Sequence, residues 1–418
     1  MLNNNYICAL DIGSSKIAAV VTQIRRKRIN SIFFETVPTK GVKRGTIIDS
    51  IELLGSVGGA LKNLKAKSGI NIKFIYTNIS GQDLISKHSH AIIPLTERGN
   101  KVVTLSDIQK VNEQARILGS NLEEEIIHQI PFGYTIDSQR EILNPLGLYS
   151  HRLEVDLYLI CARLSSIQTI TRVVNQSGYE IKDLFFSGVA TSQAVFNKEL
   201  PEGLNVLFDI GSDITEVLVF KDGMLKHVEI LSCGGNDLTL QLADELKIPL
   251  DLAEDLKRSY ASIGDYNQIK EDREILIKKN TIYKPVRQRL VAELLTSKAN
   301  FICQNIKDAV EKIMPCNDVV NFIATGRTVL LEGFLEVLEN NLGTSVKLGR
   351  IVQPDIIPFL NKTDALSGQK YLNYTTSLGI VCQALHNEQP RILSVSQPVH
   401  NPILKAINKV KEVYQEYF

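Results

Sequence analysis

The chain has no tryptophan, only three methionines and six cysteines among its 418 residues, and a net charge of only +1. The cysteines are scattered without any Cys-x-x-Cys pair, so the pattern that marks many zinc and redox sites is absent. A net charge near zero supplies no general field for nucleic acid or for an acidic surface, and no segment interleaves aromatic with basic residues. We therefore expect no nucleic-acid partner, and any membrane or protein contact must be local.

Long apolar runs are also lacking. No run reaches the roughly 18–20 residues that a membrane-spanning helix needs, and the first residues do not form a basic segment followed by an apolar one. With 44% hydrophobic and 22% charged residues, the composition is that of a soluble globular protein of two or three domains. We expect a cytoplasmic chain without a secretory signal, whose cysteines are small buried apolar side chains.

Two segments about 200 residues apart share one pattern: an apolar strand, Asp-Ile-Gly, a short polar turn and a second strand. They read ICALDIGSSKIAAVV (7–21) and NVLFDIGSDITEV (205–217). A turn of glycine and small hydroxyl residues lets backbone N–H groups approach phosphate oxygens closely. The carboxylates of Asp11 and Asp209, facing each other across a cleft, would suit a hydrated Mg²⁺. The repeat predicts two α/β halves that clamp a phosphate ligand.

Between residues 84 and 162 the pattern of apolar and polar residues changes, and it predicts a small α+β unit inserted into this repeat. It contains the strand-like HAIIPL, a polar helix over 106–118, and the segments IIHQIPFGYTID and LEVDLYLICA. Beyond the second hairpin we expect helices at 236–246, 249–259, 290–313 and 329–340, a loop or hairpin at 269–284 and a buried strand at 319–325.

The last segment, PILKAINKVKEVYQEYF (402–418), follows a polar linker and has apolar residues at helical spacing. The amphipathic helix that this predicts is too short and too charged to span a bilayer. It would either dock on its own protein or lie on a membrane surface, and we favour the membrane. The residues expected to enter the membrane interface are Ile403, Leu404, Ile407, Val410, Tyr414, Tyr417 and Phe418.

The two Asp-Ile-Gly hairpins resemble the phosphate-1 and phosphate-2 loops of the superfamily of actin, sugar kinases and heat-shock chaperone ATPases. The segment NFIATGRTVLLEGFLEVLENNLGTSVKLG (321–349) resembles the adenosine motif of that superfamily. From Ala9 to about Leu385 the chain is most similar to FtsA, the family of bacterial cell-division actin homologues. The inserted unit, with its Ser80-Gly81 boundary and its NPLGLYSHRLEVDLYLICA segment, resembles the FtsA subdomain 1C, which sugar kinases and chaperones lack.

The resemblance implies an actin-like, two-domain α/β fold of the ribonuclease-H type with an inserted α+β subdomain, 1C. The implied bounds are 1–83 plus 162–195 for subdomain 1A, 84–161 for 1C, 196–248 plus 315–390 for 2A, 249–314 for 2B, 391–401 for the linker and 402–418 for an amphipathic membrane-targeting helix.

The resemblance also implies an ATP site with Mg²⁺ held by Asp11 and Asp209. The implied nucleotide-binding residues are Asp11, Gly13, Ser14, Ser15, Lys16, Asp209, Gly211, Ser212, Glu254, Lys257, Gly326 and Arg327. The chain departs from the family pattern at Ser212 and Asp213, where glycines are usual, and at Arg327, where the adenosine loop has its second glycine. A second carboxylate at the turn would repel a triphosphate, so we expect weakened binding and at most slow hydrolysis.

By resemblance, the protein would polymerise and tether FtsZ filaments to the cytoplasmic face of the inner membrane at the division septum. Arg289 and Lys298 would meet the acidic C-terminal peptide of FtsZ, and other division proteins are possible partners. Three alternatives stay open: a nucleotide-independent pseudo-ATPase scaffold, a PilM-like pilus-assembly homologue, and a phosphotransferase such as a sugar kinase, for which no catalytic Asp motif is found.

Overall fold

The computed structural model describes residues 6–26, 28–96, 99–137, 139–196, 202–264, 273–279, 282–360, 362–387 and 397–398. The chain forms two compact units. The larger unit comprises Met1–Ile85 and Ala162–Pro390, and the smaller comprises Ser86–Cys161 and Arg391–Phe418. The amphipathic helix expected at 402–418, with its seven membrane-facing residues, lies outside the described residues.

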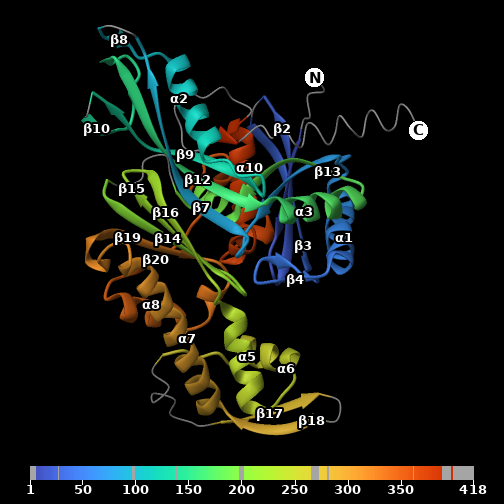
Figure 1. The fold of residues 1–418 in the computed structure, drawn as a ribbon. Helices are drawn as coiled ribbons and strands as arrows, with labels where there is room; N and C mark the ends of the chain where they lie inside the picture. The colour runs from blue at the N-terminus through green and yellow to red at the C-terminus, as the bar shows by residue number, and fades with distance from the viewer. Residues whose placement is uncertain are drawn as a thin grey trace. The chain divides into compact units, whose positions relative to one another are not determined.

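The first half of the larger unit is a five-stranded sheet in the order β13-β6-β1-β2-β3 (Figure 1). Its antiparallel part turns back and forth from β1 to β3, and β6 and β13 then continue it in parallel. Such strands, buried on both faces, need nearly continuous apolar sequence, and β1 and β2 provide it. The strands are β1 (Tyr6–Ile12), β2 (Lys16–Arg25), β3 (Arg28–Pro38), β6 (Phe74–Ile79) and β13 (Glu180–Phe186).

The second half repeats this arrangement in a sheet of order β16-β15-β14-β19-β20. Three antiparallel strands again lead into two parallel ones, so each Asp-Ile-Gly turn joins the first two strands of its sheet. The strands are β14 (Leu204–Ile210), β15 (Thr215–Lys221), β16 (Met224–Leu231), β19 (Val319–Thr325) and β20 (Val346–Leu348). The two α/β halves expected from the sequence repeat are confirmed.

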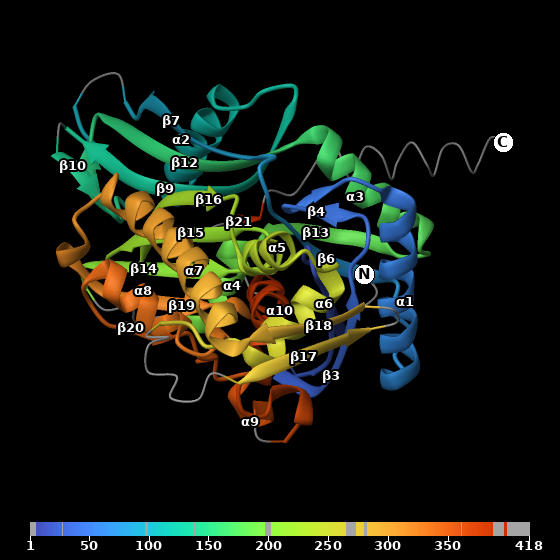
Figure 2. The same ribbon diagram turned by 90° about the horizontal axis from the view of Figure 1, so that it is seen from below.

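Helices cover both sheets in layers. Figure 2 shows α1 (Ser50–Ser68) beside α3 (Leu164–Gln176), and both pack on the first sheet. The helix α10 (Thr375–Asn387) packs on β1, β2 and β6, and its partner α4 (Ser187–Val195) also contacts β14 and β15 of the second sheet. Local signals fix α1, because the Asp49 side chain caps its first N–H groups and Gly69 ends it at φ 67°.

A mainly helical group extends the second half. It contains α5 (Gly235–Leu246), α6 (Leu250–Tyr260), α7 (Gln288–Glu311) and the hairpin β17 (Glu274–Lys279)–β18 (Ile282–Arg287), seen at the lower end of Figure 1. The segment expected as a loop or hairpin thus forms a hairpin over its described part.

One expected helix is shorter than the sequence indicated. In place of a helix over 329–340, a 3₁₀ turn, η3 (Thr328–Leu330), precedes α8 (Phe334–Leu342). Gly333 separates them at φ 80°, and a Cβ there would lie 1.7 Å from the Ile263 carbonyl oxygen. The chain needs glycine at this approach, and that break starts the helix late. Short elements complete the unit: β4 (Val42–Lys43), β5 (Thr46–Ile47), α9 (Ile357–Leu360), and the 3₁₀ helices η2 (Cys316–Asp318), η4 (Asp364–Leu366) and η5 (Lys370–Asn373).

The described part of the smaller unit is a five-stranded sheet, in which β10-β9-β12-β7 are neighbours in that order and β21 pairs with β9, with the helix α2 and a short β8–β11 ladder. The helix α2 begins with a capping box in which Thr104 and Asp107 bond each other's backbone N–H groups. The two-residue strand β21 pairs with β9. The elements are β7 (Leu84–Pro94), β8 (Lys101–Val102), α2 (Leu105–Leu118), β9 (Glu124–Ile136), β10 (Gln139–Ile142), β11 (Tyr149–Ser150), β12 (Arg152–Arg163) and β21 (Gln397–Pro398).

All six cysteines are buried free thiols, as expected. Among the helices built from described residues, none combines the length and the apolar character that crossing a bilayer would take.

Candidate functional site

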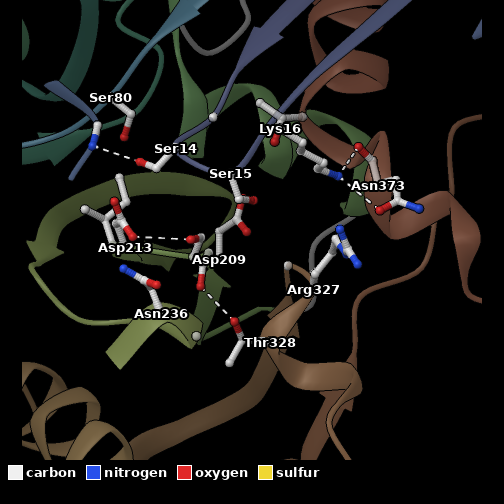
Figure 3. A pocket seen from close by; sticks show the side chains of 18 of the residues that line it. Ser14, Ser15, Lys16, Ser80, Asp209, Asp213, Asn236, Arg327, Thr328 and Asn373 are labelled. Carbon is white, nitrogen blue, oxygen red and sulfur yellow. Dashed lines mark hydrogen bonds between the residues drawn. The ribbon is translucent and has the colours of Figure 1, made fainter. Parts of the chain in front are cut away.

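A cavity of about 490 Å³ in the larger unit is lined by all twelve residues that the sequence singled out for nucleotide binding (Figure 3). They come from the two Asp-Ile-Gly turns, from α6 and from the loop after β19. These segments are far apart in the chain, and the fold brings them together. The twelve lining residues are Asp11, Gly13, Ser14, Ser15, Lys16, Asp209, Gly211, Ser212, Glu254, Lys257, Gly326 and Arg327.

The first turn runs from Gly13 to Lys16 between β1 and β2. It is closed by the Gly13 N–H, which donates to the Lys16 carbonyl oxygen at 3.1 Å. The Ser14 hydroxyl accepts the backbone N–H of Gly45 at 3.1 Å. The turn is therefore tied to the hairpin between β4 and β5.

The second turn runs from Gly211 to Ile214 between β14 and β15 and is closed in the same way, at 3.0 Å. The start of α5 supports it from behind, because the Asn236 N–H donates to the Ser212 carbonyl oxygen at 2.7 Å. The Thr328 hydroxyl donates to the Gly211 carbonyl oxygen at 2.7 Å. The two turns are thus held rigidly along the same cavity.

The carboxylates at the two turns are each held by a neutral donor. The Asn78 amide donates to Asp11 Oδ1 at 2.8 Å, and the Thr191 hydroxyl donates to Asp209 Oδ2 at 2.9 Å. Burial raises the pKa of Asp11 to about 7, a shift that Lys16 opposes and Asp209 reinforces. Burial also raises the pKa of Asp209. In the protein alone, nearby positive charge is therefore too weak to keep the pKa values of these two carboxyl groups at their ordinary level.

The positive charge of Lys16 lowers the pKa of both Asp11 and Asp209 and so partly offsets the effect of burial. Burial lowers its pKa to about 8, against the pull of Asp11. Its ammonium group also donates to the side-chain oxygen of Asn373 at 3.2 Å, which turns it toward the segment before α10 (Figure 3).

The donor set fits Mg²⁺ bound together with phosphates. A third acid, Glu216, is 3% exposed, and its pKa is raised well above the usual value by burial and then by Asp209. Its Oε2 is buried and has no hydrogen-bond partner among the residues that the structure describes. Among the described residues no three acidic, His or Cys side chains are arranged to hold a metal by themselves. A cation here would therefore rely on Asp11, Asp209, water and phosphate oxygens, as Mg²⁺ commonly does.

Another part of the cavity lining is an ion-pair group on α6. Lys257 is 6% exposed, and its ammonium donates to the Gly235 carbonyl oxygen and the Thr239 hydroxyl, both at 2.8 Å. It also pairs with Glu254 at 2.6 Å, which in turn pairs with Arg258 at 2.7 Å. These pairs stabilise the α5–α6 junction, so the Lys257 ammonium is already engaged by the protein.

The loop after β19 lies beside the second turn, because a Cβ on Gly326 would come within 2.9 Å of Asp209 Oδ1. Gly326 has φ 91°, and a Cβ there would lie 2.3 Å from the Ile210 carbonyl oxygen, so only glycine fits. Arg327 follows, and its side chain points into the cavity (Figure 3). Burial lowers its pKa, and so does Arg258. A guanidinium in this position suits an aromatic base or a negative group.

The two residues predicted to meet a partner lie outside the cavity, near the start and middle of α7. Arg289 is exposed, and the Lys298 ammonium lies over the Phe301 ring, 4.8 Å from its centroid. Phe301 is 56% exposed. This ring was not predicted as part of the partner surface. Its spacing was the available signal, because a residue three positions after Lys298 lies beside it on a helix.

Sequence reasoning also missed the residues that support the site. Asn78, Thr191 and Asn373 are neutral polar residues, and no turn pattern or regular spacing marks them as parts of a site. The tip of the β4–β5 hairpin was missed as well, although its Arg44-Gly45 dipeptide between short apolar stretches is a turn signal.

Two parts of the chain match models of known protein families. Residues 81–161 match the model for the "SHS2 domain inserted in FTSA", and residues 206–379 match the model for "Cell division protein FtsA". A "Cell division protein FtsA" of Borreliella burgdorferi is 26% identical over 354 residues, which cover 83% of this chain and 85% of the relative.

Among solved structures, the chain resembles a PilM-PilN type IV pilus biogenesis complex with a TM-score of 0.60 at 15% identity, covering 92% of this chain and 99% of that one. It also resembles MreB5 of Spiroplasma citri bound to ADP, with a TM-score of 0.53 at 10% identity, covering 92% and 98%. At these identities, the likeness concerns the fold alone: an actin-like α/β protein with an inserted domain.

Proposed function

Because the chain belongs to the FtsA family of cell-division proteins, we propose that it is a nucleotide-binding, self-assembling adaptor that tethers FtsZ filaments to the cytoplasmic face of the membrane at the division septum. Its subdomains would be those expected from the sequence. Catalytic turnover would be slow or absent, so the nucleotide would stabilise a closed, assembly-competent form.

The observation that most strongly supports this proposal is the convergence of both Asp-Ile-Gly turns and the Gly326 loop on one cavity. Asp11 and Asp209 would hold Mg²⁺, and the ion would neutralise phosphate charge when bound. Backbone N–H groups of the two turns would meet the phosphates. Arg327, Glu254 and Arg258 would border the base and ribose.

The partner surface on α7 is proposed to receive the acidic C-terminal peptide of FtsZ. The exposed Arg289 and the half-buried Lys298 would attract an acidic peptide and speed its association. The exposed Phe301 ring beside Lys298 would add an apolar contact. A double variant, Arg289→Glu with Lys298→Glu, should therefore weaken peptide binding. The matched control reverses Lys307 and Lys312, two cations at the other end of α7, and should bind like the unaltered protein.

Membrane attachment is proposed for the segment 402–418 and would be modest for a single chain, because its charges nearly balance. Several copies in a polymer would give firm attachment through multivalency.

Reconstitution on vesicles tests the whole proposal. Vesicles containing anionic lipid, FtsZ with GTP and the full-length protein should sediment or float together. A chain ending at Gln397 should leave FtsZ in solution. FtsZ recruitment that is equal with and without the terminal segment would contradict the tethering function.

A further inference from the structure

The tip of the β4–β5 hairpin, Arg44 and Gly45, is a rigid pair of backbone donors at the edge of the cavity. Both residues have positive φ, 51° and 75°, as in the tight two-residue turns that suit antiparallel strands. A Cβ on Gly45 would lie 2.7 Å from the Gly81 Cα, so the tip is seated backbone to backbone against the end of β6. Its N–H groups therefore have fixed positions.

Each N–H group of the tip bonds a different Asp-Ile-Gly turn. The Gly45 N–H donates to Ser14 of the first turn at 3.1 Å, and the Arg44 N–H donates to Asp213 Oδ2 of the second turn at 2.9 Å. The other oxygen, Oδ1, accepts from the Ser212 hydroxyl at 3.3 Å. Figure 3 shows Ser14 and Asp213 on facing walls of the cavity. Asp213 thus links the second half of the larger unit to the first.

The two turns have the same backbone hydrogen bond but opposite charge. In matching positions, Ser15 of the first turn corresponds to Asp213 of the second, and Lys16 corresponds to Ile214. The first turn therefore offers a phosphate a cation and hydroxyl groups. The second offers it a carboxylate and no cation. A phosphate group lying between the two turns would be attracted by one and repelled by the other.

We propose that Asp213 makes the cavity select nucleoside diphosphates over triphosphates. Its carboxylate lies in the second turn and already accepts the Arg44 N–H, so a terminal phosphate that approached this turn would meet a negative charge and an occupied donor. This inference rests on the proposed function, which puts the base near Arg327 and α6. With the base there, the third phosphate of a triphosphate would lie next to the Asp213 carboxylate or displace it. The phosphates of a diphosphate would not reach Asp213.

The test measures ADP and ATP affinity, each with Mg²⁺, for the intact protein and for Asp213→Asn. Asparagine keeps one oxygen that accepts the Arg44 N–H and removes the charge. Its NH₂ group replaces the oxygen that accepts from Ser212, and the Ser212 hydroxyl can accept from that group instead. We expect the unaltered protein to bind ADP more tightly than ATP by about tenfold. The variant should gain about tenfold in ATP affinity, with ADP affinity unchanged within about twofold. Asp222→Asn is the matched control, because Asp222 also lies in a hairpin turn and accepts a backbone N–H, from Gly203 at 2.8 Å, but does not line the cavity.

The outcomes separate this inference from the proposed function. If both nucleotides bind and Asp213→Asn leaves their affinity ratio unchanged, the selectivity of Asp213 is refuted while the nucleotide site stands. If Asp222→Asn shifts the affinity ratio as much as Asp213→Asn does, the selectivity does not depend on the position of the Asp213 charge, and the inference is refuted. If the folded protein and its variants bind neither nucleotide, both proposals fall together.

Discussion

The Asn78 amide bridges the Asp11 side chain and the backbone of the next residue, Ile12. Its nitrogen donates to Asp11 Oδ1 at 2.8 Å, and its oxygen accepts the Ile12 N–H at 2.7 Å. The same nitrogen donates to the Ser187 hydroxyl at 2.8 Å, so one buried side chain fixes the first carboxylate of the site relative to β6 and α4.

Replacing this amide should cost stability. Asn78→Ala leaves the buried groups around Asp11 unpaired, so we expect the free energy of unfolding to fall by about 1–3 kcal/mol in urea titrations. Asn112→Ala, which removes a half-buried bond to Tyr134, is the control, and the loss there should be at most about 1.5 kcal/mol. Equal losses in the two variants would contradict the central position given to Asn78.

Two glycines with similar φ provide a test of the adenosine-side loop. Gly326 and Gly343 have φ 91° and 74°, but a Cβ meets the Ile210 carbonyl oxygen only at Gly326. Gly343→Ala should cost about 1–2 kcal/mol from backbone strain alone. Gly326→Ala should cost about 1–3 kcal/mol more from the clash. Thermal unfolding of both variants would show this, and a smaller loss at Gly326 would contradict the close approach.

The two ion pairs of Glu254 on α6 should contribute very different amounts to the free energy of unfolding. Lys257→Ala leaves Glu254 and the Gly235 carbonyl oxygen without their buried donor, so we expect a loss of about 2–4 kcal/mol. Arg258→Ala removes a largely exposed pair with the same Glu254 and should cost under about 1 kcal/mol. Chemical denaturation measures both. A Lys257 loss no larger than the Arg258 loss would show that the ammonium is not structural.

The raised pKa of Asp11, about 7, sets a pH dependence with a definite sign. In the protein free of metal and nucleotide, the proton on Asp11 favours folding. This contribution is fully present below the ordinary carboxyl pKa near 4 and is lost as the pH rises through about 7. Stability should thus fall from pH 5 to pH 8, and Asp11→Asn should flatten that slope.

Metal binding has the opposite pH dependence, because the cation requires the ionised carboxylate. Mg²⁺-dependent nucleotide affinity should therefore weaken by up to about tenfold for each pH unit below 7. Asp183, whose pKa burial also raises to about 7, lies outside the cavity and is the control. Asp183→Asn should alter the slope of stability and leave the pH dependence of nucleotide binding intact; an equal effect on binding would contradict the assignment.

The sequence predicted the parts of the site that are made of local patterns. The two Asp-Ile-Gly turns and Gly326 each follow an apolar strand. The second turn and Gly326 follow the parallel neighbours β14 and β19, whose ends meet at one edge of the second sheet, and the first turn has the corresponding place in the first sheet. Asp213 was noticed as a departure, but its partner was not foreseeable: Arg44 lies 169 positions away, and the contact depends on how the two halves fold together.

Other misses have the same origin. The helix expected from residue 329 begins only after Gly333, because Ile263, from a distant segment, occupies the space that a side chain would need. Asn78 is one polar residue in the buried strand β6, and its function follows from its neighbours in the folded sheet.

The most direct test of the account is equilibrium binding of labelled ADP and ATP to the purified protein, with and without Mg²⁺. We expect micromolar binding that depends on Mg²⁺ and is lost in Asp209→Asn, with ADP preferred. Absence of binding at millimolar nucleotide by a folded protein would contradict it.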